Sequence, residues 1–361
     1  MTLLKKVDFY NTFFQKDKIS SLFLKILYKY NNTVFYNTKD SYATSNTKVA
    51  FISLFPQYLD AELANSRKLR VKKIKQKKLD GFGILIDGVK DIDTFLANKF
   101  KSSTRGPIKK NIKRLESCFN IHSKMFFGKI TESEYNTIMP KLKEMLTRRF
   151  VQRNNSNEAF DKWNFYLNST IALIKNKEAS LFVLYSDNDI IGISLNYHIE
   201  KIFIGHIIAY DIDYSKFGLG NTIVYKLLEW NIKNNYTIFD MGNGSLDYKR
   251  IWSNFTYNYE YYIAYTNKSI LALIIGQLEI LKIQVKNTLK VLNVISFYRN
   301  FKNRCFNKNT PQKNLTKPFR LEEINMELFE NINSTKIEYS HVAYKTVKKA
   351  VLDFAFSKQE H

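Results

Sequence analysis

Two stretches of the chain combine residue types that could hold and process a substrate. In the first, residues 210–221, Tyr210-Asp211 closes a strand-like run, and Gly218 and Gly220 precede a helical pattern. Glycine lets the backbone approach a ligand closely, and the free N–H groups at a helix N-terminus bind phosphate well. An ordinary turn could also contain Gly-x-Gly, and the third glycine of a dinucleotide-binding fingerprint is missing.

The second stretch, residues 238–252, places a carboxylate at the end of a predicted strand. Asp240 is followed by Gly242 and Gly244, so a ligand could come close to the backbone there. A carboxylate at the rim of a sheet can act as a general base, and we predict Asp240 as the first candidate and Asp211 as the second. The alternative for Asp240 is a structural role in a cap or turn.

The end of this second stretch carries Asp247-Tyr248-Lys249-Arg250-Ile251-Trp252. Lys249 could bind a phosphate or a substrate carboxylate, or simply pair with Asp247. Tyr248 and Trp252 fit a hydrophobic core as well as a substrate wall.

The segments around both stretches predict a sheet flanked by helices. Alternating and apolar runs joined by tight turns predict an antiparallel meander of three strands, 180–186, 190–199 and 202–211. Residues 221–233 then have the helical period, with inward-facing positions at Ile223, Val224, Leu227 and Leu228. Two further strands are expected at 236–241 and 257–266.

Upstream, residues 104–119 read as a helix that Thr104 caps, with Pro107 in its first turn. Its surface is crowded with lysine and arginine, which suits either solubility or a phosphate-bearing ligand. Two more helices are expected at 132–150, where Pro140 could break the helix, and at 157–175.

The first 90 residues have weaker patterns. They predict a short helix at 21–28, buried strands at 49–55 and 82–86, and a basic loop or sheet edge at 67–78.

The longest helical pattern covers residues 268–304. Its apolar stripe, with lysines on another face, predicts packing against its own domain, and a dimer helix or a membrane-surface helix is the alternative. Leu271, Leu278 and Leu281 belong to this stripe. A polar linker at 307–317 and a helical tail at 319–361 follow.

Composition limits the classes of partner and location. The net charge of +23 favours phosphates, nucleic acid, anionic lipid or acidic glycans, although a generally basic surface is the plain alternative. The two cysteines and five scattered histidines show no zinc spacing, so no metal is expected. Without a predicted signal peptide or membrane span, we expect a cytoplasmic protein, with membrane association as an alternative.

The order of meander, glycine turn, helix, strand, Asp-x-Gly-x-Gly and Tyr-Lys with a following Trp resembles the GNAT acetyltransferase superfamily. It is most similar to the CelD-type (BioF-associated) domain, a relative of the FemABX aminoacyl transferases. The resemblance covers about residues 100–265, and the basic helix around Arg105 also resembles the family. The usual pyrophosphate turn is richer in glycine and often basic, whereas Tyr214-Ser215-Lys216 stands before Gly218 here.

This resemblance implies an N-acyltransferase that passes an acyl group from acyl-CoA, acetyl-CoA first, to an amine of an amino sugar or another cell-envelope precursor. It implies catalytic roles for Asp240, Asp211 and Lys249. The implied donor site comprises Phe217, Gly218, Leu219, Gly220 and Asn221. The implied acceptor site comprises Tyr210, Tyr248, Trp252 and Arg105. The alternatives are an aminoacyl-tRNA-dependent transferase of FemABX type and a non-catalytic basic binding module.

The expected fold is α+β and GNAT-like, with a mixed, mostly antiparallel sheet flanked by helices. We expect an N-terminal lobe at 1–95, for which a degenerate GNAT half is the alternative description, the acyltransferase domain at 96–267, and a helical extension at 268–361.

Overall fold

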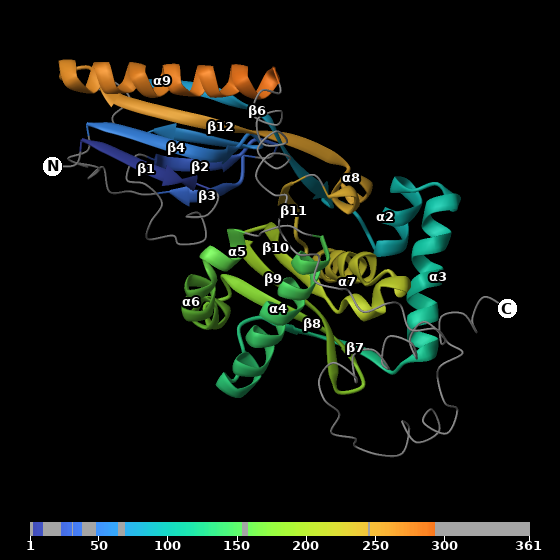
Figure 1. Ribbon diagram of the computed structural model, residues 1–361. Helices are drawn as coiled ribbons and strands as arrows, with labels where there is room; N and C mark the ends of the chain where they lie inside the picture. Colours follow the sequence, from blue (N-terminus) through green and yellow to red (C-terminus); the bar gives the residue numbers. More distant parts are fainter. Residues whose placement is uncertain are drawn as a thin grey trace, which may run out of the picture. The chain divides into compact units, whose positions relative to one another are not determined.

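A computed structural model describes residues 3–9, 23–30, 32–37, 48–63, 69–153, 158–244 and 246–292. These residues form two units whose chain segments alternate (Figure 1). The first unit comprises the described residues up to Asp87, Tyr197–Gly205, and those from Asn235 on; the second comprises Gly88–Asn196 and His206–Asn234. The domain boundaries expected after residues 95 and 267 stay predictions.

The first unit contains strands hydrogen-bonded in the order β1-β4-β12-β6-β11-β10. Their bounds are β1 Leu4–Asp8, β4 Val49–Pro56, β6 Leu69–Leu85, β10 Ile202–Tyr210, β11 Ile238–Asn243 and β12 Phe255–Thr266. The β1–β4 and β10–β11 pairs are parallel, and the β4–β12, β12–β6 and β6–β11 pairs are antiparallel. The strand predicted at 49–55 is confirmed.

A smaller sheet in the same unit has the order β3-β2-β5, with β2 Phe23–Tyr28, β3 Val34–Asn37 and β5 Leu59–Leu63. The short helix predicted at 21–28 is therefore wrong where the structure describes it. Aromatic and branched side chains favour a pleated strand, and β2 gains a hydrogen-bonded partner on each side, which a helix would forgo.

The basic segment at 67–78 lies largely within β6 and is not a loop. Residues 69–75 and 80–83 of β6 pair with β12, whereas β11 pairs with β6 only over residues 81–85. Within the described strands, the basic part of β6 is therefore an edge, as one of the two expectations had it. Lysines on an edge discourage pairing with another chain.

Strand β12 changes register near its middle. Its pairing with β6 shifts between Asn258 and Glu260, and its pairing with β4 shifts between Glu260 and Tyr262. The extra residues lie in the partner strands, because β6 advances from Asp80 to Lys75 and β4 from Phe55 to Ile52 while β12 advances two residues at each shift. Tyr257 and Tyr259 place their hydroxyls 3.0 Å apart, whereas Tyr261 belongs to the cluster that packs against the last helix.

In the last helix, α9 (Ile270–Val291), the apolar stripe that was predicted to be buried is exposed, so this prediction is wrong. Leu271, Leu278 and Leu281 are 49%, 48% and 56% exposed. The packed face is instead the opposite one, with Ala272, Gly276, Glu279, Ile280 and Ile283. Gly276 allows this close approach, because a Cβ there would lie 2.5 Å from the Tyr265 ring. Residues beyond 292, including the predicted linker and tail, lie outside the described part.

The second unit contains the order β10-β9-β8-β7, and β9 and β10 also supply residues to the first unit. Its strands include β7 Ile121–Phe126, β8 Ala179–Ser186 and β9 Asp189–Ile199. Its helices are α2 Ile92–Lys99, α3 Ser102–Cys118, α4 Glu132–Arg153, α5 Glu158–Asp161, α6 Trp163–Lys175, η3 Ile212–Phe217 and α7 Leu219–Lys233. The order of the predicted meander and its following helix is confirmed.

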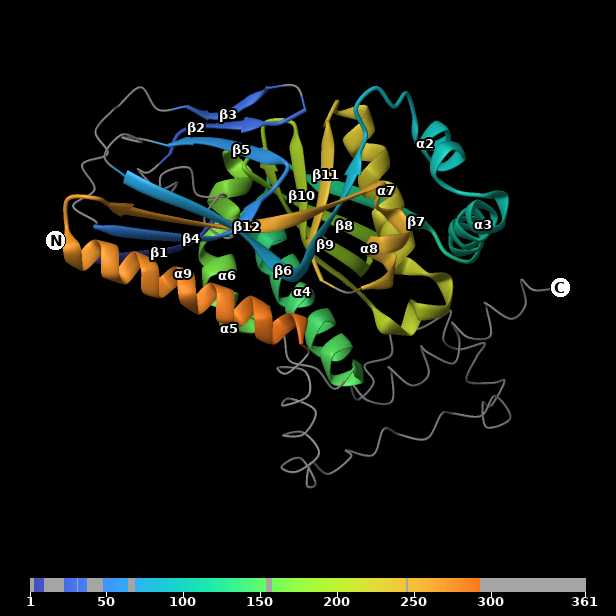
Figure 2. The same cartoon turned by 90° about the horizontal axis from the view of Figure 1, so that it is seen from above.

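The helices of this unit cover the two faces of its strands, with α7 on one face and α4 and α6 on the other (Figures 1 and 2). Ile223 of α7 packs where Gly192 of β9 leaves room, because a Cβ at that glycine would lie 2.8 Å from the Ile223 side chain. The four predicted inward residues of α7 are fully buried. With the sheet of the first unit, this confirms the mixed, mostly antiparallel GNAT-like fold class.

Two predictions that involved a proline are wrong: the helix start close to Pro107, and the alternative of a break at Pro140. Helix α3 begins at Ser102, so Thr104 lies inside it and Lys101 is the N-cap, while Pro107 lies in its interior. Helix α4 continues through Pro140. Packing of the buried apolar faces of α3 and α4 outweighs the single backbone hydrogen bond that each proline removes.

Candidate functional site

Asp240 is the most enclosed carboxylate of the predicted site. It lies in β11 of the first unit and is 0% exposed. The Tyr58 hydroxyl donates to Oδ2 at 2.6 Å, and the Tyr257 hydroxyl lies 2.7 and 2.8 Å from the two carboxylate oxygens. The backbone N–H of Gly242 donates to Oδ1 at 2.6 Å. Every close partner of this carboxylate is thus an uncharged donor.

Burial raises the pKa of Asp240, because the charged form is deprived of water. Hydrogen bonds from Tyr58, Tyr257 and Gly242, and the charge of Lys249, act in the opposite direction. The carboxylate therefore has a higher proton affinity than an ordinary aspartate while its position is fixed by three donors. Both properties suit a group that exchanges a proton during a reaction.

Lys249 is the only other predicted catalytic residue in this unit. It lies in the short helix α8 (Asp247–Trp252), is 8% exposed, and donates to the backbone carbonyl of Asn243. Burial lowers its pKa to about 8, and the charge of Asp240 opposes that shift. The lysine thus holds the polar loop after β11 and stabilises the ionised form of Asp240, and within the described chain it forms no ion pair with Asp247.

The predicted donor turn lies in the second unit and differs from a simple strand-to-helix turn. The 3₁₀ helix η3 follows β10, and Gly218 then adopts a left-handed conformation, with φ of +67°, as the N-cap of α7. Asn221 and Thr222 donate their N–H groups to the Gly218 carbonyl at 2.9 and 3.2 Å. No side chain caps the helix at Gly218.

The two residues that begin α7 are Leu219 and Gly220, and within the described chain their N–H groups have no acceptor. Gly220 lies beside Tyr210, since a Cβ at Gly220 would lie 3.3 Å from the Tyr210 ring. Phe217 and Leu219 are fully buried, so they support the turn from inside. Free N–H groups at the start of a helix suit an anion.

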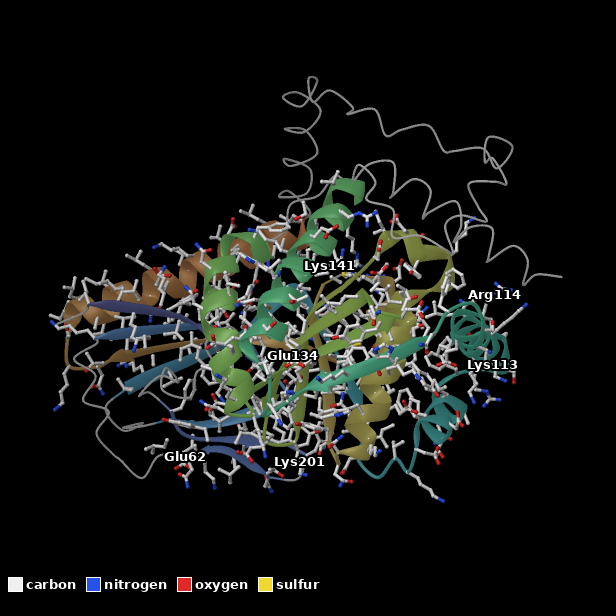
Figure 3. The ribbon with its side chains drawn as sticks, turned by 90° about the horizontal axis from the view of Figure 1, so that it is seen from below. Glu62, Lys113, Arg114, Glu134, Lys141 and Lys201 are labelled. Atoms are coloured by element: carbon white, nitrogen blue, oxygen red, sulfur yellow. The ribbon has the colours of Figure 1, made fainter. Side chains whose placement is uncertain are left out.

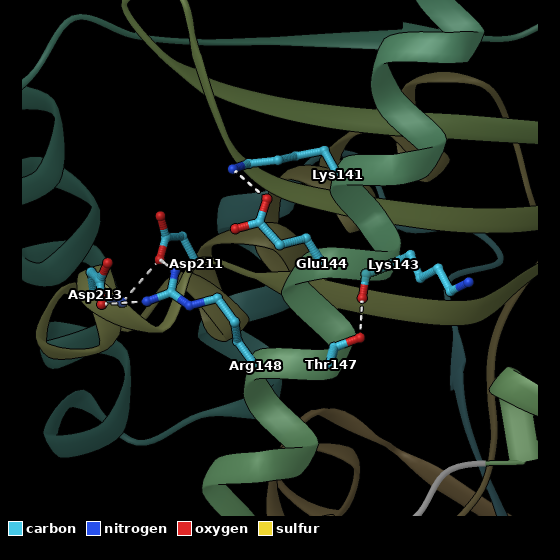
Figure 4. Close-up of polar contacts among 7 residues, drawn as sticks. All are labelled: Lys141, Lys143, Glu144, Thr147, Arg148, Asp211 and Asp213. Carbon is cyan, nitrogen blue, oxygen red and sulfur yellow. Dashed lines mark hydrogen bonds and ion pairs between the residues drawn. The ribbon is translucent and has the colours of Figure 1, made fainter. Parts of the chain in front are cut away.

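Asp211 has a different environment from Asp240. The Arg148 guanidinium donates to Asp211 at 2.7 Å and to Asp213 at 2.8 Å, as Figure 4 shows. Asp211 also accepts the N–H of Asp213 at 3.1 Å and serves as the N-cap of η3. Arg148 thereby ties α4 to the segment that leads into the donor turn.

The neighbouring Arg149 covers the predicted acceptor residue Tyr210. Its guanidinium lies 4.9 Å from the centre of the Tyr210 ring and donates to the Ile208 carbonyl at 3.2 Å. This cation–π contact fixes the ring beside Gly220. Tyr210 therefore borders the donor turn.

Helix α3 presents a basic hollow in the same unit. An open cavity of about 510 Å³ is lined by Gly106, Lys109, Lys110, Lys113, Arg114 and Ser117. Lys109 pairs with Asp93, whereas no acid pairs with the exposed Lys110 and Lys113 in the described chain. Lys113 and Arg114 are labelled on this helix in Figure 3. Asn111, on the same helix, would lie 3.2 Å from a Cβ at Gly218.

The structure thus brings together two groups of predicted residues. Asp240 and Lys249 interact electrostatically in the first unit, where Trp252 is fully buried in the core and Tyr248 is half-buried. Tyr210, Asp211 and the turn 217–221 lie together in the second unit, where Arg105 is a half-buried residue of α3. The catalytic and binding roles of all these residues stay predictions.

Sequence analysis missed the tyrosines around Asp240 and the two α4 arginines Arg148 and Arg149. Tyr257 and Tyr259 alternate along a strand, and this spacing could have indicated a shared polar face. Tyr58 and Arg148 carry no such signal, because they meet their partners only through the fold. Among the described residues, no group of three His, Cys, Asp or Glu side chains could hold a metal ion.

Comparison with known proteins gives one family match. Residues 102–250 match the model of the acetyltransferase (GNAT) domain. No curated protein matches the sequence. The match confirms the predicted GNAT resemblance and the prediction of an acyltransferase enzyme, and a domain of this kind uses an acyl-CoA type of co-substrate in general.

Several solved structures are distantly similar to this chain. A conserved protein of unknown function from Bacteroides thetaiotaomicron is 12% identical, with a TM-score of 0.41 over 60% of this chain and 70% of that chain. L-PGS from Bacillus licheniformis is 14% identical, with a TM-score of 0.36 over 63% and 72%. FemX is 12% identical, with a TM-score of 0.33 over 64% and 75%. Likeness at this level does not bear on substrate or mechanism.

Proposed function

Since residues 102–250 form an acetyltransferase domain of the GNAT family, we propose that this protein transfers an acyl group from acyl-CoA, acetyl-CoA first, to an amine. The observation that carries the proposal is that the matched region includes both the glycine turn before α7 and the buried Asp240. From the family resemblance, the proposed acceptor is an amino sugar or another cell-envelope precursor. The proposed location is the cytoplasm, with contact to the membrane surface.

The residues of the second unit fit the phosphates of such a donor. The N–H groups of Leu219 and Gly220 and the dipole of α7 favour a diphosphate. Lys110 and Lys113 add positive charge on α3, the helix that contacts the turn through Asn111. The thioester of the donor supplies the activated acyl group, and this chain's contribution is to hold the phosphates.

The residues of the first unit fit the proton transfer. The acceptor nitrogen bonds to the acyl carbon, the carbon–sulfur bond breaks, the leaving sulfur takes up a proton as the thiol forms, and the nitrogen gives up a proton. Asp240 has the raised pKa that such a proton acceptor needs, but it is 0% exposed. We therefore assign the transfer to Asp240 through a tyrosine. The hydroxyl of Tyr58 or Tyr257 takes the nitrogen's proton while its own proton passes to Asp240.

An aminoacyl-tRNA donor is the second candidate, and the basic hollow on α3 is the observation that favours it. Lys110 and Lys113, which have no acidic partner in the described chain, suit the RNA backbone as well as a diphosphate. The two donors differ in how strongly binding depends on salt. An RNA that contacts many phosphates binds much more weakly as salt rises, whereas a single nucleotide is less sensitive.

Donor binding is tested by thermal shift of the full chain with acetyl-CoA, free CoA or bulk tRNA at two salt concentrations. We expect both CoA compounds to raise the melting temperature. The double variant Lys110→Glu/Lys113→Glu should bind CoA at least about tenfold more weakly, because each charge-assisted contact contributes about 1.5–3 kcal/mol. The matched control is Lys129→Glu/Lys201→Glu, at two other exposed lysines.

A shift with tRNA and none with millimolar CoA would replace the first candidate by the second. No shift with either, together with no acyl transfer to amines, would contradict both and leave a non-catalytic module.

A further inference from the structure

Helix α9 has two apolar faces, and the described residues cover only one of them. Ala272, Gly276, Ile280 and Ile283 face the sheet of the first unit and pack with residues of β4 and β12. On the opposite side, large apolar side chains are exposed along the whole helix. These are Ile270, Leu271, Ile274, Leu278, Leu281, Val285, Leu289 and Leu292, which we call the α9 stripe.

The spacing of the α9 stripe makes it a continuous surface. Steps of three and four residues connect Leu271, Ile274, Leu278, Leu281 and Val285, so these side chains lie on one side of the helix. A helix of 22 residues is about 33 Å long. Figure 1 shows α9 lying along β12 with its other side turned away from the sheet of that unit. A contiguous apolar surface of this length marks a binding surface.

The charges around the stripe are of one sign. Lys282 and Lys286 are exposed on one flank of α9, and the edge strand β6 adds exposed Lys75 and Lys77 close to its C-terminal half, where Asn287 bonds to the β6 backbone at both residues. The one acidic residue of α9, Glu279, faces inward and bonds to Lys6 and Lys282. A partner that fits this face is therefore apolar where it contacts the α9 stripe and anionic where it contacts the lysines.

We propose that α9 is a membrane-surface helix, which lies in the plane of an anionic lipid bilayer with the α9 stripe in the acyl region and the lysines at the headgroups. An in-plane helix needs this combination of an apolar face and a lysine-bearing flank. No helix in the described part of the chain is long and apolar enough to cross a membrane. The proposal stands on the first unit alone and does not depend on acyl transfer.

A second copy of the chain is the main competing occupant, because steps of three and four residues also suit helix pairing. Two copies would bring Lys282 and Lys286 of each helix to the same interface. Lys282 is paired with Glu279 of its own helix, but α9 has no exposed acid to compensate Lys286 or to pair with the lysines of the other copy. Charge therefore favours the lipid surface over the dimer.

The test is flotation of the full-length protein with vesicles of phosphatidylcholine alone or of phosphatidylcholine with phosphatidylglycerol, at low and high salt. We expect binding to the anionic vesicles that is at least tenfold stronger than to the neutral ones and that weakens with salt. Leu278→Asn/Leu281→Asn should lower partitioning by about tenfold or more, because two buried leucines are lost from the lipid contact. Lys282→Gln/Lys286→Gln should lower binding to anionic vesicles only.

The matched control is Phe165→Asn/Leu167→Asn, which removes two exposed apolar side chains of α6. It should bind vesicles like the unchanged protein, and all variants should keep their melting temperature within a few degrees. Equal binding by the Leu278/Leu281 variant and the unchanged protein would overturn the proposal. So would absence of vesicle binding together with a dimer, seen by sedimentation velocity, that the same variant dissociates.

Discussion

Asp240, within β11, and Asp211, directly after β10, are both buried carboxylates, yet they are held by different chemistry. Asp240 accepts from Tyr58, Tyr257 and a backbone N–H, all of them uncharged. Asp211 shares the guanidinium of Arg148 with Asp213. Neutral donors fix a carboxylate without satisfying its charge, so its affinity for a proton rises with burial. A guanidinium compensates the charge and makes the carboxylate a structural anchor.

Among the tests of this contrast between Asp240 and Asp211, we expect the largest effect on turnover. Asp240→Asn keeps the size of the side chain and removes its charge, and we expect acyl transfer to fall about 100- to 10,000-fold, the range of a positioned base. The melting temperature and donor binding should stay close to those of the unchanged protein. Asp211→Asn should cost less turnover and more stability. Full turnover in Asp240→Asn with none in Asp211→Asn would reverse the two roles.

Removing the positive charge on the Asp211 side should mainly affect stability. Arg148→Met leaves two buried carboxylates without their counter-charge, and we expect a loss of about 3 kcal/mol in the free energy of unfolding. The measurement is urea unfolding. The control is Lys141→Gln in the same helix, whose pair with Glu144 is partly exposed (Figure 4) and contributes about 0.2–0.5 kcal/mol. Equal losses in both variants would show that the Arg148 pair is not an anchor.

Weakening the tyrosine contacts should shift the pH profile. The Tyr257 hydroxyl lowers the pKa of Asp240, so Tyr257→Phe should raise that pKa further. The acidic limb of the pH profile of turnover should therefore move to higher pH by about one unit. At neutral pH we expect turnover to fall about tenfold. Tyr261→Phe, on the same strand but packed under α9, is the control. An unchanged acidic limb in Tyr257→Phe would assign that limb to another group.

The smallest expected effect concerns Lys249, whose pKa is lowered to about 8. As the pH rises through about 8, the lysine loses the charge that stabilises the ionised Asp240, so turnover should decline; Lys249→Met should lack this alkaline limb. Because the folded-state pKa lies below the unfolded one, the charged lysine disfavours folding below about 8. Stability should therefore rise between about 8 and 10.5 in the unchanged protein and not in the variant. Thermal melts across this range would reveal an identical rise in both if the lysine were not involved.

The sequence predicted the elements that have a strong period and missed the contacts that only the fold creates. Ile223, Val224, Leu227 and Leu228 revealed α7 because a helix repeats its buried positions every three or four residues. The Tyr58–Asp240 contact joins residues 182 positions apart, and no local pattern carries such information. The environment of Asp240 was therefore beyond the sequence, and the prediction that Asp240 ends its strand is wrong, because β11 continues to Asn243.

Helix α9 shows a different limit. Its large apolar residues predicted a helix correctly, but they also suggested that the large residues face the core. The sheet instead covers the side with Ala272 and Gly276, because small residues let Tyr265 and its neighbours pack close to the helix. Periodicity identifies two faces of a helix, and it does not say which face the protein covers.

Strand β12 contributes to two separate parts of the first unit, one on each side of its register shift. The number of residues in the strand therefore matters more for the fold than most of its individual side chains. On one side, Tyr257 hydrogen-bonds to Asp240 and to Tyr259. On the other side, Tyr261, Ile263 and Tyr265 pack against α9. A substitution at one end of β12 can therefore leave the contacts at the other end unchanged. Because the extra residues at the shift lie in the partner strands β4 and β6, deletion of Glu260 would move one end of β12 out of register with both partners, and the strand would lose either the contacts around Asp240 or the packing against α9.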